Sequence, residues 1–467
     1  MLQAIANIAK VSDLRKRVLF TLFILAVYRL GAHIPTPGIN TKLLQQWFQQ
    51  NGGTLLGYLD IFSGGNFRRL TVFALGIMPY ITASIILELM TVVWPYLEKL
   101  QKEGQLGRKK ITQYTRYLTI VLSIFQSLGI ALTLVKSGQF VLHPGPGFIL
   151  MTILTLTTGS AFVMWLGEQI TDRGIGNGMS LIIFAGIVVG LPNGIYNLYT
   201  KVRDSAWGPF TVPAVVLLLG LMVAVVAFIV FVEKSERRVP VQYAKRVMGR
   251  KMMGGQSTHL PLRVNSGGVM PVIFAASILA FPQTLLNFST TIKHNKVLGP
   301  LLDSISYGRP GYSLVYSAAI LFFAYFYVSI IFNPVEVADN MRKYGGFIPG
   351  IRPGKRTAEY LNEILTRLTF VGGLYLIAVS LLPQFLIVGT QLQHLPWFLG
   401  GTWFDTFPTW FLNGLNLNFY FGGTSLLIVV GVAMDTVQQI EAQLIMRHYE
   451  GFTTRSTRIR GRRAYWA

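Results

Sequence analysis

The sequence contains no cysteine and few charged residues. The absence of cysteine from its 467 residues excludes disulfide bonds and thiolate chemistry. Only 13% of the residues are charged, 52% are hydrophobic, and the mean hydropathy is +0.48. Because soluble domains carry roughly 25% charged residues, this composition predicts an integral membrane protein.

Acidic residues are also scarce, with 19 Asp and Glu against 41 Lys and Arg, so the formal net charge is +22. Such a charge is compatible with nucleic-acid binding, but in a membrane protein its usual cause is Lys and Arg on cytoplasmic loops. Residues 1–17 form a basic amphipathic segment without a small-residue cleavage site. We therefore expect an uncleaved, cytoplasmic N-terminus.

Catalytic and metal-binding patterns are missing as well. The six histidines are scattered without the spacing of metal ligands. The glycines around Gly174-Ile-Gly176-Asn-Gly178 resemble a phosphate-binding loop, but they follow an apolar span and not a strand, so a tight turn is predicted. The sequence indicates neither an enzyme nor a cofactor.

Long apolar runs, in contrast, are abundant. About 20 apolar residues suffice to cross a bilayer, and such runs lie near residues 18–34, 71–93, 114–136, 147–167, 178–200, 210–232, 264–288, 311–333, 367–390 and 419–443. With both termini inside, 30 Lys and Arg residues fall in inner loops and 8 in outer ones, which supports this orientation. No charged residue lies near the middle of a span; Glu88 and Asp435 lie toward inner ends.

One apolar motif occurs twice. Gly76-Ile-Met-Pro79-Tyr-Ile81 in one half is echoed by Gly268-Val-Met-Pro271-Val-Ile273 in the other, as expected of a duplicated membrane protein. Counted from Thr71, Ile77 and Ile81 would lie one helical turn apart, with Ile81 near the membrane centre. Each proline is expected to kink its helix.

The predicted fold class is therefore an all-α integral membrane protein with ten transmembrane helices in two five-helix halves. Because five is odd, the second half is inverted relative to the first. The predicted parts are a first half over residues 18–200, an outer connection over 201–209 and a second half over 210–443.

Two cytoplasmic loops of the second half are longer than topology requires. Segment 233–263 alternates apolar and polar residues around VPVQYA, which predicts a short hairpin. In segment 334–367, glycines and prolines predict turns that expose Arg352, Lys355 and Arg356. A basic cytoplasmic tail is predicted over residues 444–467. These charges suit partner docking, although contact with anionic lipid is an alternative.

Several of these stretches resemble the SecY family of bacterial protein-conducting channels. They are LTVFALGIMPYITASIILEL, MWLGEQITDRGIGNGMSLIIFAGIV, ERRVPVQYAKR, QSTHLPLRVNSGGVMPVIFA, FIPGIRPGKRTAEYLN and FYFGGTSLLIV. The resemblance covers nearly the whole chain. It implies a channel of the Sec translocase in the bacterial cytoplasmic (inner) membrane, which moves unfolded preproteins across and releases hydrophobic helices laterally. The alternative is an inverted-repeat small-solute transporter, disfavoured by the uncharged midplane and the large basic loops.

The resemblance also implies functional residues. A pore ring would be formed by Ile77, Ile81, Met179, Ile183, Ile273 and Ile428. A plug would occupy residues 54–70 and include Leu55, Phe62, Ser63, Gly64 and Gly65. A lateral gate would separate the spans beginning at Thr71 and Val264, with gate residues Thr82, Glu88, Asn265 and Phe281.

Further implications concern partners. Docking of the SecA motor or a translating ribosome would use Arg246, Arg250, Arg352, Lys355 and Arg356. The other implied partners are the SecE and SecG subunits, signal sequences, nascent or unfolded preproteins, and the lipid bilayer. Across the closed gate, Glu88 and Asn265 are expected to share a hydrogen bond. Glu88 is a departure at a position where the family also uses Gln, and the outer loop 391–418 has no assigned role.

Overall fold

The computed structural model describes residues 12–50, 63–137, 140–203, 211–243, 246–248, 251–253, 257–288, 309–389 and 423–455. A helix lies at each of the ten predicted spans. These helices are α2 (Ser12–Gly31), α5 (Met78–Val93), α7 (Gln105–Ser137), α8 (Pro146–Arg173), α9 (Gly178–Arg203), α10 (Thr211–Lys234), α11 (Met270–Phe288), α14 (Pro310–Ile331), α16 (Lys355–Val388) and α18 (Gly423–Arg455).

Six helical segments in the described part of the chain are long and apolar enough to cross a membrane. A seventh arises if α5 and the short helix α6 (Pro95–Lys102), which meet at a 99° bend, are counted together. The helices α7, α16 and α18 extend beyond their predicted spans into polar sequence. Hydropathy locates the apolar window, whereas the helix continues wherever polar residues with good helix propensity follow.

The start of α5 differs from the prediction. Thr71 forms an isolated β-bridge with Pro35, and residues 72–77 form turns. Gly76 has a φ of 54°, and the helix begins at Met78 with Pro79 in its first turn. The echoed motif behaves alike, since Gly268 has a φ of 58° and Pro271 lies in the first turn of α11. Proline is tolerated there because its missing N–H has no helical partner at that position. The predicted kinks are therefore wrong, and a depth counted from Thr71 no longer applies.

A small sheet lies outside the helices, so the prediction of an all-α fold holds for the membrane-spanning part only. As predicted, segment 233–263 forms a hairpin, of β1 (Glu236–Tyr243) and β4 (Ser257–Arg263). The unpredicted strand β5 (Gly346–Phe347) comes from the next long loop and pairs with the other side of β1. A second, two-stranded sheet joins β2 (Arg246–Met248) to β3 (Lys251–Met253).

An apolar cluster anchors this sheet to the helices. Val239 of β1 and Leu262 of β4 pack with Val328 of α14 and Leu361 of α16. Between these helices, α15 (Pro334–Lys343) starts at the side chain of Asn333, which accepts bonds from two backbone N–H groups. The two long loops thus form one structural unit.

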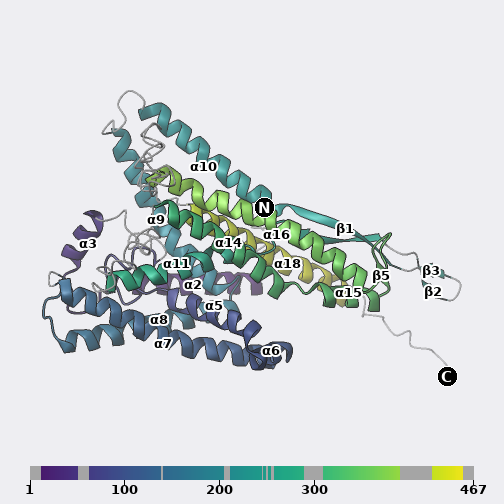
Figure 1. The fold of residues 1–467 in the computed structure, drawn as a ribbon, viewed down its shortest axis with the longest axis horizontal. Helices are drawn as coiled ribbons and strands as arrows, with labels where there is room; N and C mark the ends of the chain where they lie inside the picture. The colour runs from purple at the N-terminus through teal and green to yellow at the C-terminus, as the bar shows by residue number, and fades with distance from the viewer. Residues whose placement is uncertain are drawn as a thin grey trace, which may run out of the picture.

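The two ends of the molecule carry different elements. In Figure 1, β1 and β5 project from one end of the helix bundle, and α3 (Thr41–Gln50) lies at the opposite end. The predicted topology assigns these elements to the inner and outer sides. Between the ends, the main apolar core draws side chains from α2, α5, α8, α9, α10, α11, α14, α16 and α18.

Candidate functional site

The isoleucines of the predicted ring are all buried in the main apolar core. Their exposed fractions do not exceed 8%, and all belong to one apolar cluster: Ile77, Ile81, Ile183, Ile273 and Ile428. Met179 packs against this cluster and is partly buried. The contributing elements are α5 with the residue that caps it, α9, α11 and α18, so both halves of the chain take part.

Local backbone structure positions the first two members of the ring. Ile77 precedes α5 as its N-cap residue, and the N–H of Ile81 donates to the carbonyl of Ile77 at 3.1 Å. The two side chains are thus one turn apart, as predicted. Branched aliphatic side chains offer no group that replaces the hydration shell of an ion, so a ring of them blocks ions while remaining deformable.

Glycines allow α8 and α18 to pack closely against the segments that lead into α5 and α11. A Cβ atom added to Gly159 of α8 would lie 1.9 Å from the carbonyl oxygen of Val72. A Cβ atom added to Gly431 of α18 would lie 2.3 Å from Cγ2 of Val269. Real Cβ contacts are not this short, so these helices pack as tightly as they do only because both residues are glycine.

The described part of the predicted plug lies against α9. Ser63 is buried, and a Cβ atom on Gly64 would lie 2.7 Å from the Cα atom of Gly186, three residues after Ile183. Gly64 has a φ of 71° and Gly65 a φ of 81°, conformations that glycine adopts without strain. Leu55 and Phe62 lie outside the described residues.

Two hydrogen bonds missed by the sequence analysis attach this segment to α2. The Nδ2 atom of Asn66 donates to the hydroxyl oxygen of Tyr28 at 3.3 Å, and both side chains are buried. The Nη1 atom of Arg29 donates to the carbonyl oxygen of Gly64 at 3.4 Å. The signal available in the sequence was Tyr28 followed directly by Arg29 at the predicted outer end of an apolar span. The spacing of these residues does not indicate that Asn66 and Gly64 are their partners.

The predicted gate helices α5 and α11 pack against each other. Several small residues of these two helices are buried, including Ala83, Ala275 and Ser277. The hydroxyl of Thr82 donates to Met78 O of its own helix, and that of Ser277 donates to Ile273 O. These hydroxyls therefore do not lock the helices together. Phe281 lies in α11, but its side chain is outside the described set.

The expected hydrogen bond between Asn265 and Glu88 is wrong. Asn265 Nδ2 donates instead to Glu233 Oε1 at 2.7 Å and to the carbonyl of Gly268 at 3.1 Å. The hairpin register explains this, because pairing of Glu236 with Arg263 brings the end of α10 beside the turn that precedes α11. A carboxylate at the end of an apolar span was the sequence signal that could have revealed Glu233.

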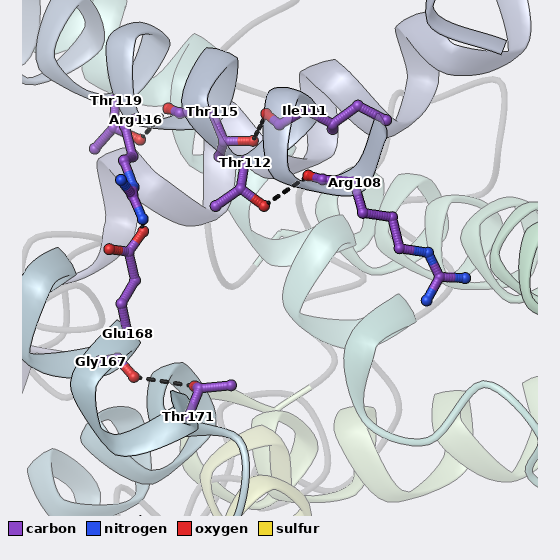
Figure 2. Close-up of polar contacts among 9 residues, drawn as sticks. All are labelled: Arg108, Ile111, Thr112, Thr115, Arg116, Thr119, Gly167, Glu168 and Thr171. Atoms are coloured by element: carbon purple, nitrogen blue, oxygen red, sulfur yellow. Dashed lines mark hydrogen bonds and ion pairs between the residues drawn. The ribbon is translucent and has the colours of Figure 1, made fainter. Parts of the chain in front are cut away.

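Glu88 is left without this partner. Its Oε2 atom is buried and has no hydrogen-bond partner among the residues that the structure describes. Nearby, Arg116 Nε of α7 donates to Glu168 Oε1 of α8 at 2.7 Å, the ion pair drawn in Figure 2. Figure 2 also shows threonine hydroxyls of α7 and α8 bonded to carbonyls of their own helices. The pair thus joins α7 to α8 directly.

The predicted docking residues of the second loop are exposed. Arg352 precedes α16, and its carbonyl accepts a bond from the Thr357 hydroxyl at 2.9 Å. Lys355 and Arg356 occupy the first turn of α16 and are exposed too. Cations at a helix N-terminus oppose the macrodipole, so these residues do not serve helix stability. Arg246 begins β2, whereas Arg250 lies outside the described residues.

Comparison with known proteins decides the family. A family model described as SecY matches residues 71–437. The chain belongs to the SecY family. Curated SecY relatives, each named a protein translocase subunit, match at nearly full length. The relative from Streptomyces griseus is 48% identical over 97% of this chain and 100% of its own. The SecY of Aquifex aeolicus is 44% identical over 96% of this chain and 98% of its own.

Solved structures share the SecY fold. One described as a protein-conducting channel aligns with a TM-score of 0.61 at 18% identity, over 92% of both chains. Sec61 in a canine ribosome–channel complex aligns with a TM-score of 0.59 at 17% identity, again over 92% of both chains. The SecY-family chain is accordingly a multi-pass membrane protein and the protein-conducting channel of the Sec translocase. It is a transporter and not an enzyme. The alternative function considered from the sequence, a small-solute transporter, is therefore rejected.

Proposed function

We propose that the buried isoleucine cluster is the constriction through which this channel passes unfolded chains. The observation that carries the proposal is the convergence of six predicted ring residues, from both halves of the chain, in one apolar core. Such a ring seals against ions by excluding water, and its aliphatic side chains separate around a polypeptide. At rest the channel is closed by Ile77, Ile81, Met179, Ile183, Ile273 and Ile428.

The plug adds a second closure in this proposal. It comprises residues 54–70, including Leu55, Phe62, Ser63, Gly64 and Gly65. The contact of Gly64 with Gly186 supports this role, because it sets the segment beside the helix that contributes Ile183. One solved SecY-fold structure is described as having a plug domain that stabilises the closed state and maintains a membrane seal. We assign the same role to the segment here.

The lateral gate lies between α5 and α11, along Thr82, Glu88, Asn265 and Phe281. Both helices bury small residues, such as Ala83 and Ala275. Small residues allow two membrane helices to approach and separate without large interlocking side chains. When the helices part, a segment in the pore meets lipid. Each Leu, Ile, Phe or Val then gains about 0.3–0.6 kcal/mol in the membrane, whereas a central Asp, Lys or Arg costs about 2.5–3.5 kcal/mol. Hydrophobic helices therefore leave sideways, and polar chains continue across.

Energy comes from partners on the cytoplasmic side. The joined loops, with Arg246, Arg250, Arg352, Lys355 and Arg356, form the dock for the SecA motor or a ribosome, and SecE and SecG complete the channel. Guanidinium groups suit bidentate contacts to an acidic partner. We place the chain in the bacterial cytoplasmic membrane with both termini inside. Its halves are residues 18–200 and 210–443, joined by 201–209.

A stalled preprotein tests this function. Photo-crosslinking probes are placed at Ile81 and Ile273, at Thr82, and as a control at Phe125, which is 66% exposed on α7. We expect the mature part of the stalled chain to label the ring positions and its apolar signal to label Thr82. Equal labelling at Phe125, or none at the ring, would contradict the proposal.

A further inference from the structure

The turn between α8 and α9 is a glycine-rich motif that the channel mechanism described above does not use. It comprises residues 174–178 and leads directly into α9, the helix that carries Ile183. Its sequence resembles a phosphate-binding loop, in which free backbone N–H groups contact an anion. In this structure, N–H groups at three positions of the turn donate instead to side chains of α2, α8 and α18. The turn therefore joins helices.

Two threonines hold the turn to the first half. The N–H of Ile175 donates to Oγ1 of Thr21 in α2 at 3.1 Å. The N–H of Gly178 donates to Oγ1 of Thr171 in α8 at 2.9 Å. Each hydroxyl also donates to a carbonyl of its own helix, and Figure 2 draws the one in α8. A Cβ atom on Gly178 would lie 1.9 Å from the carbonyl oxygen of Gly167, so the turn is also in close backbone contact with α8.

The third contact crosses to the second half. The N–H of Gly176 donates to Oε1 of Gln439 in α18 at 3.1 Å. A Cβ atom on Gly176 would lie 3.4 Å from Oγ1 of Thr436, three residues before Gln439 on the same helix. The helix α18 is also held by its own half, because Arg263 of β4 donates to Oε1 of Gln438 at 2.7 Å. The Gly176–Gln439 bond thus joins a turn fixed to one half to a helix fixed to the other.

The covalent connection between the halves is at the opposite end of α9. The helix runs from Gly178 to Arg203, and α10 begins at Thr211. Its 26 residues place the Gly176–Gln439 bond about 38 Å from that connection along the helix axis. At the end of α9 where the bond lies, the separation of the halves is therefore opposed by non-covalent contacts and not by the chain itself.

We propose that Gln439 is a latch of the closed channel, whose bond to Gly176 forms at rest and breaks when a polypeptide opens the channel. The inference deepens the proposed function and rests on it, because it requires that the ring opens by movement of one half against the other. One hydrogen bond shifts such an equilibrium roughly 2- to 10-fold, which biases the channel toward closure without preventing opening. Gln439 is exposed, so water replaces the bond when it breaks.

Three substitutions in α18 test the latch. Gln439→Leu removes the acceptor and keeps a good helix former. Gln439→Glu keeps an oxygen acceptor, and its charge strengthens the bond. Gln443→Leu is the control, because it makes the same change one turn further along the helix. Thermal unfolding midpoints in detergent verify that all three variants fold.

Two activities of the channel are measured with these variants. One is the resting ion conductance in planar bilayers. The other is translocation of a reporter with a shortened apolar signal into vesicles that contain the reconstituted channel and its partners. We expect Gln439→Leu to raise both about fivefold, and Gln439→Glu to remain at or below the parent level. Gln443→Leu should match the parent.

Amide hydrogen exchange tests whether the bond breaks on opening. Overlapping peptides that cover residues 174–178 are compared in the resting channel and in a channel that holds a stalled preprotein. We expect faster exchange in the occupied channel, and equally fast exchange in resting Gln439→Leu. A contact that only stabilises the fold would not respond to occupancy.

The outcomes separate this inference from the channel function. The latch is overturned if exchange is the same at rest and when occupied, if Gln439→Leu matches Gln443→Leu, or if Gln439→Glu leaks as much as Gln439→Leu. Each of these results leaves the channel function intact. Absence of labelling at Ile81 and Ile273 by a stalled preprotein would instead overturn the proposed function, and with it the basis of the latch.

Discussion

Gly159 is the residue at which α8 meets the chain that leads into α5. Because a Cβ atom there would lie 1.9 Å from the Val72 carbonyl oxygen, even alanine must displace backbone. Val72 is also fixed from the other side, since its N–H donates to Ile34 O at 2.9 Å. We expect a displacement of this segment to shift Ile77, which lies five residues further along the chain.

Gly159→Ala is therefore expected to destabilise the protein. Overpacking of this kind costs about 1–3 kcal/mol, so the midpoint of thermal unfolding in detergent should fall. Gly147→Ala, on the same helix with nothing within 4 Å of the added Cβ, is the control. It should be neutral or slightly stabilising, since alanine favours helix over glycine by up to about 1 kcal/mol. Equal midpoints for the two variants would show that α8 does not depend on this contact.

Individual residues differed in how far the sequence could predict them. Ile77, Ile81 and Ile273 lie in a duplicated motif, and their burial follows from the motif and the family resemblance together. The position of Glu233 at the end of an apolar span marks it as a candidate polar contact, but its pairing with Asn265 could not be predicted, because that pairing depends on the register of the β1–β4 hairpin. Contacts between distant segments depend on tertiary geometry that local patterns do not contain.

At the scale of elements, the start of α16 carries the clearest functional signal outside the ring. Three exposed cations stand at a helix N-terminus, where they oppose the helix dipole. The same unit includes β5, which ties this loop to the β1–β4 hairpin. The two loops therefore form one continuous surface that a single partner could contact.

Arg352→Glu is expected to abolish SecA-driven translocation. The reversed charge repels an acidic partner surface, while Arg352 is exposed and its loss leaves the fold in place. Translocation into inverted vesicles and membrane insertion of the variant itself are the two measurements. Lys109→Glu, an exposed charge reversal in α7, controls for the change in net charge. The docking assignment fails if Arg352→Glu translocates as well as Lys109→Glu.

The gate elements can be tested by a disulfide, because the chain has no native cysteine. Thr82→Cys and Phe281→Cys, a pair that the family resemblance places across the seam, are combined and oxidised. We expect an efficient crosslink that stops translocation and a reductant that restores it. Each single variant controls for the substitution. Full transport with the bridge formed would mean that α5 and α11 do not separate.

Apolar windows predicted where the ten helices lie, but not where they begin and end. The predicted start of α5 was too early. Residues 71–77 are as apolar as a membrane-spanning helix, but Gly76 has a φ of 54°, which lies outside the helical range, so the helix begins only after it. Strand β5 was missed because two residues carry no periodicity. Both errors arise where backbone geometry, and not hydropathy, decides the structure.

At the scale of the whole molecule, both halves of the chain contribute side chains to one apolar core, and the small sheet and α3 lie at opposite ends of the helix bundle. Figure 1 places α3 at the end opposite the β1–β5 sheet. The excess of Lys and Arg in the loops assigned to the sheet side predicts that this end is cytoplasmic.

Single cysteines at the two ends test this topology. Lys42→Cys, exposed on α3, should react with a membrane-impermeant maleimide added to intact cells. Lys109→Cys, exposed at the start of α7, should react only after the membrane is opened. The reverse labelling pattern would invert the orientation of the entire molecule.

The central claim is that the isoleucine ring seals the channel, and ion conductance in planar bilayers tests it most directly. Ile81→Gly combined with Ile273→Gly removes two buried members of the ring, one from each half. Ile86→Gly combined with Ile278→Gly makes the same change on the same helices at side chains that are 37% and 39% exposed. We predict a raised resting conductance for the ring variant and a parent-like one for the control. A ring variant that is folded, inserted and as tight as the parent would contradict the account.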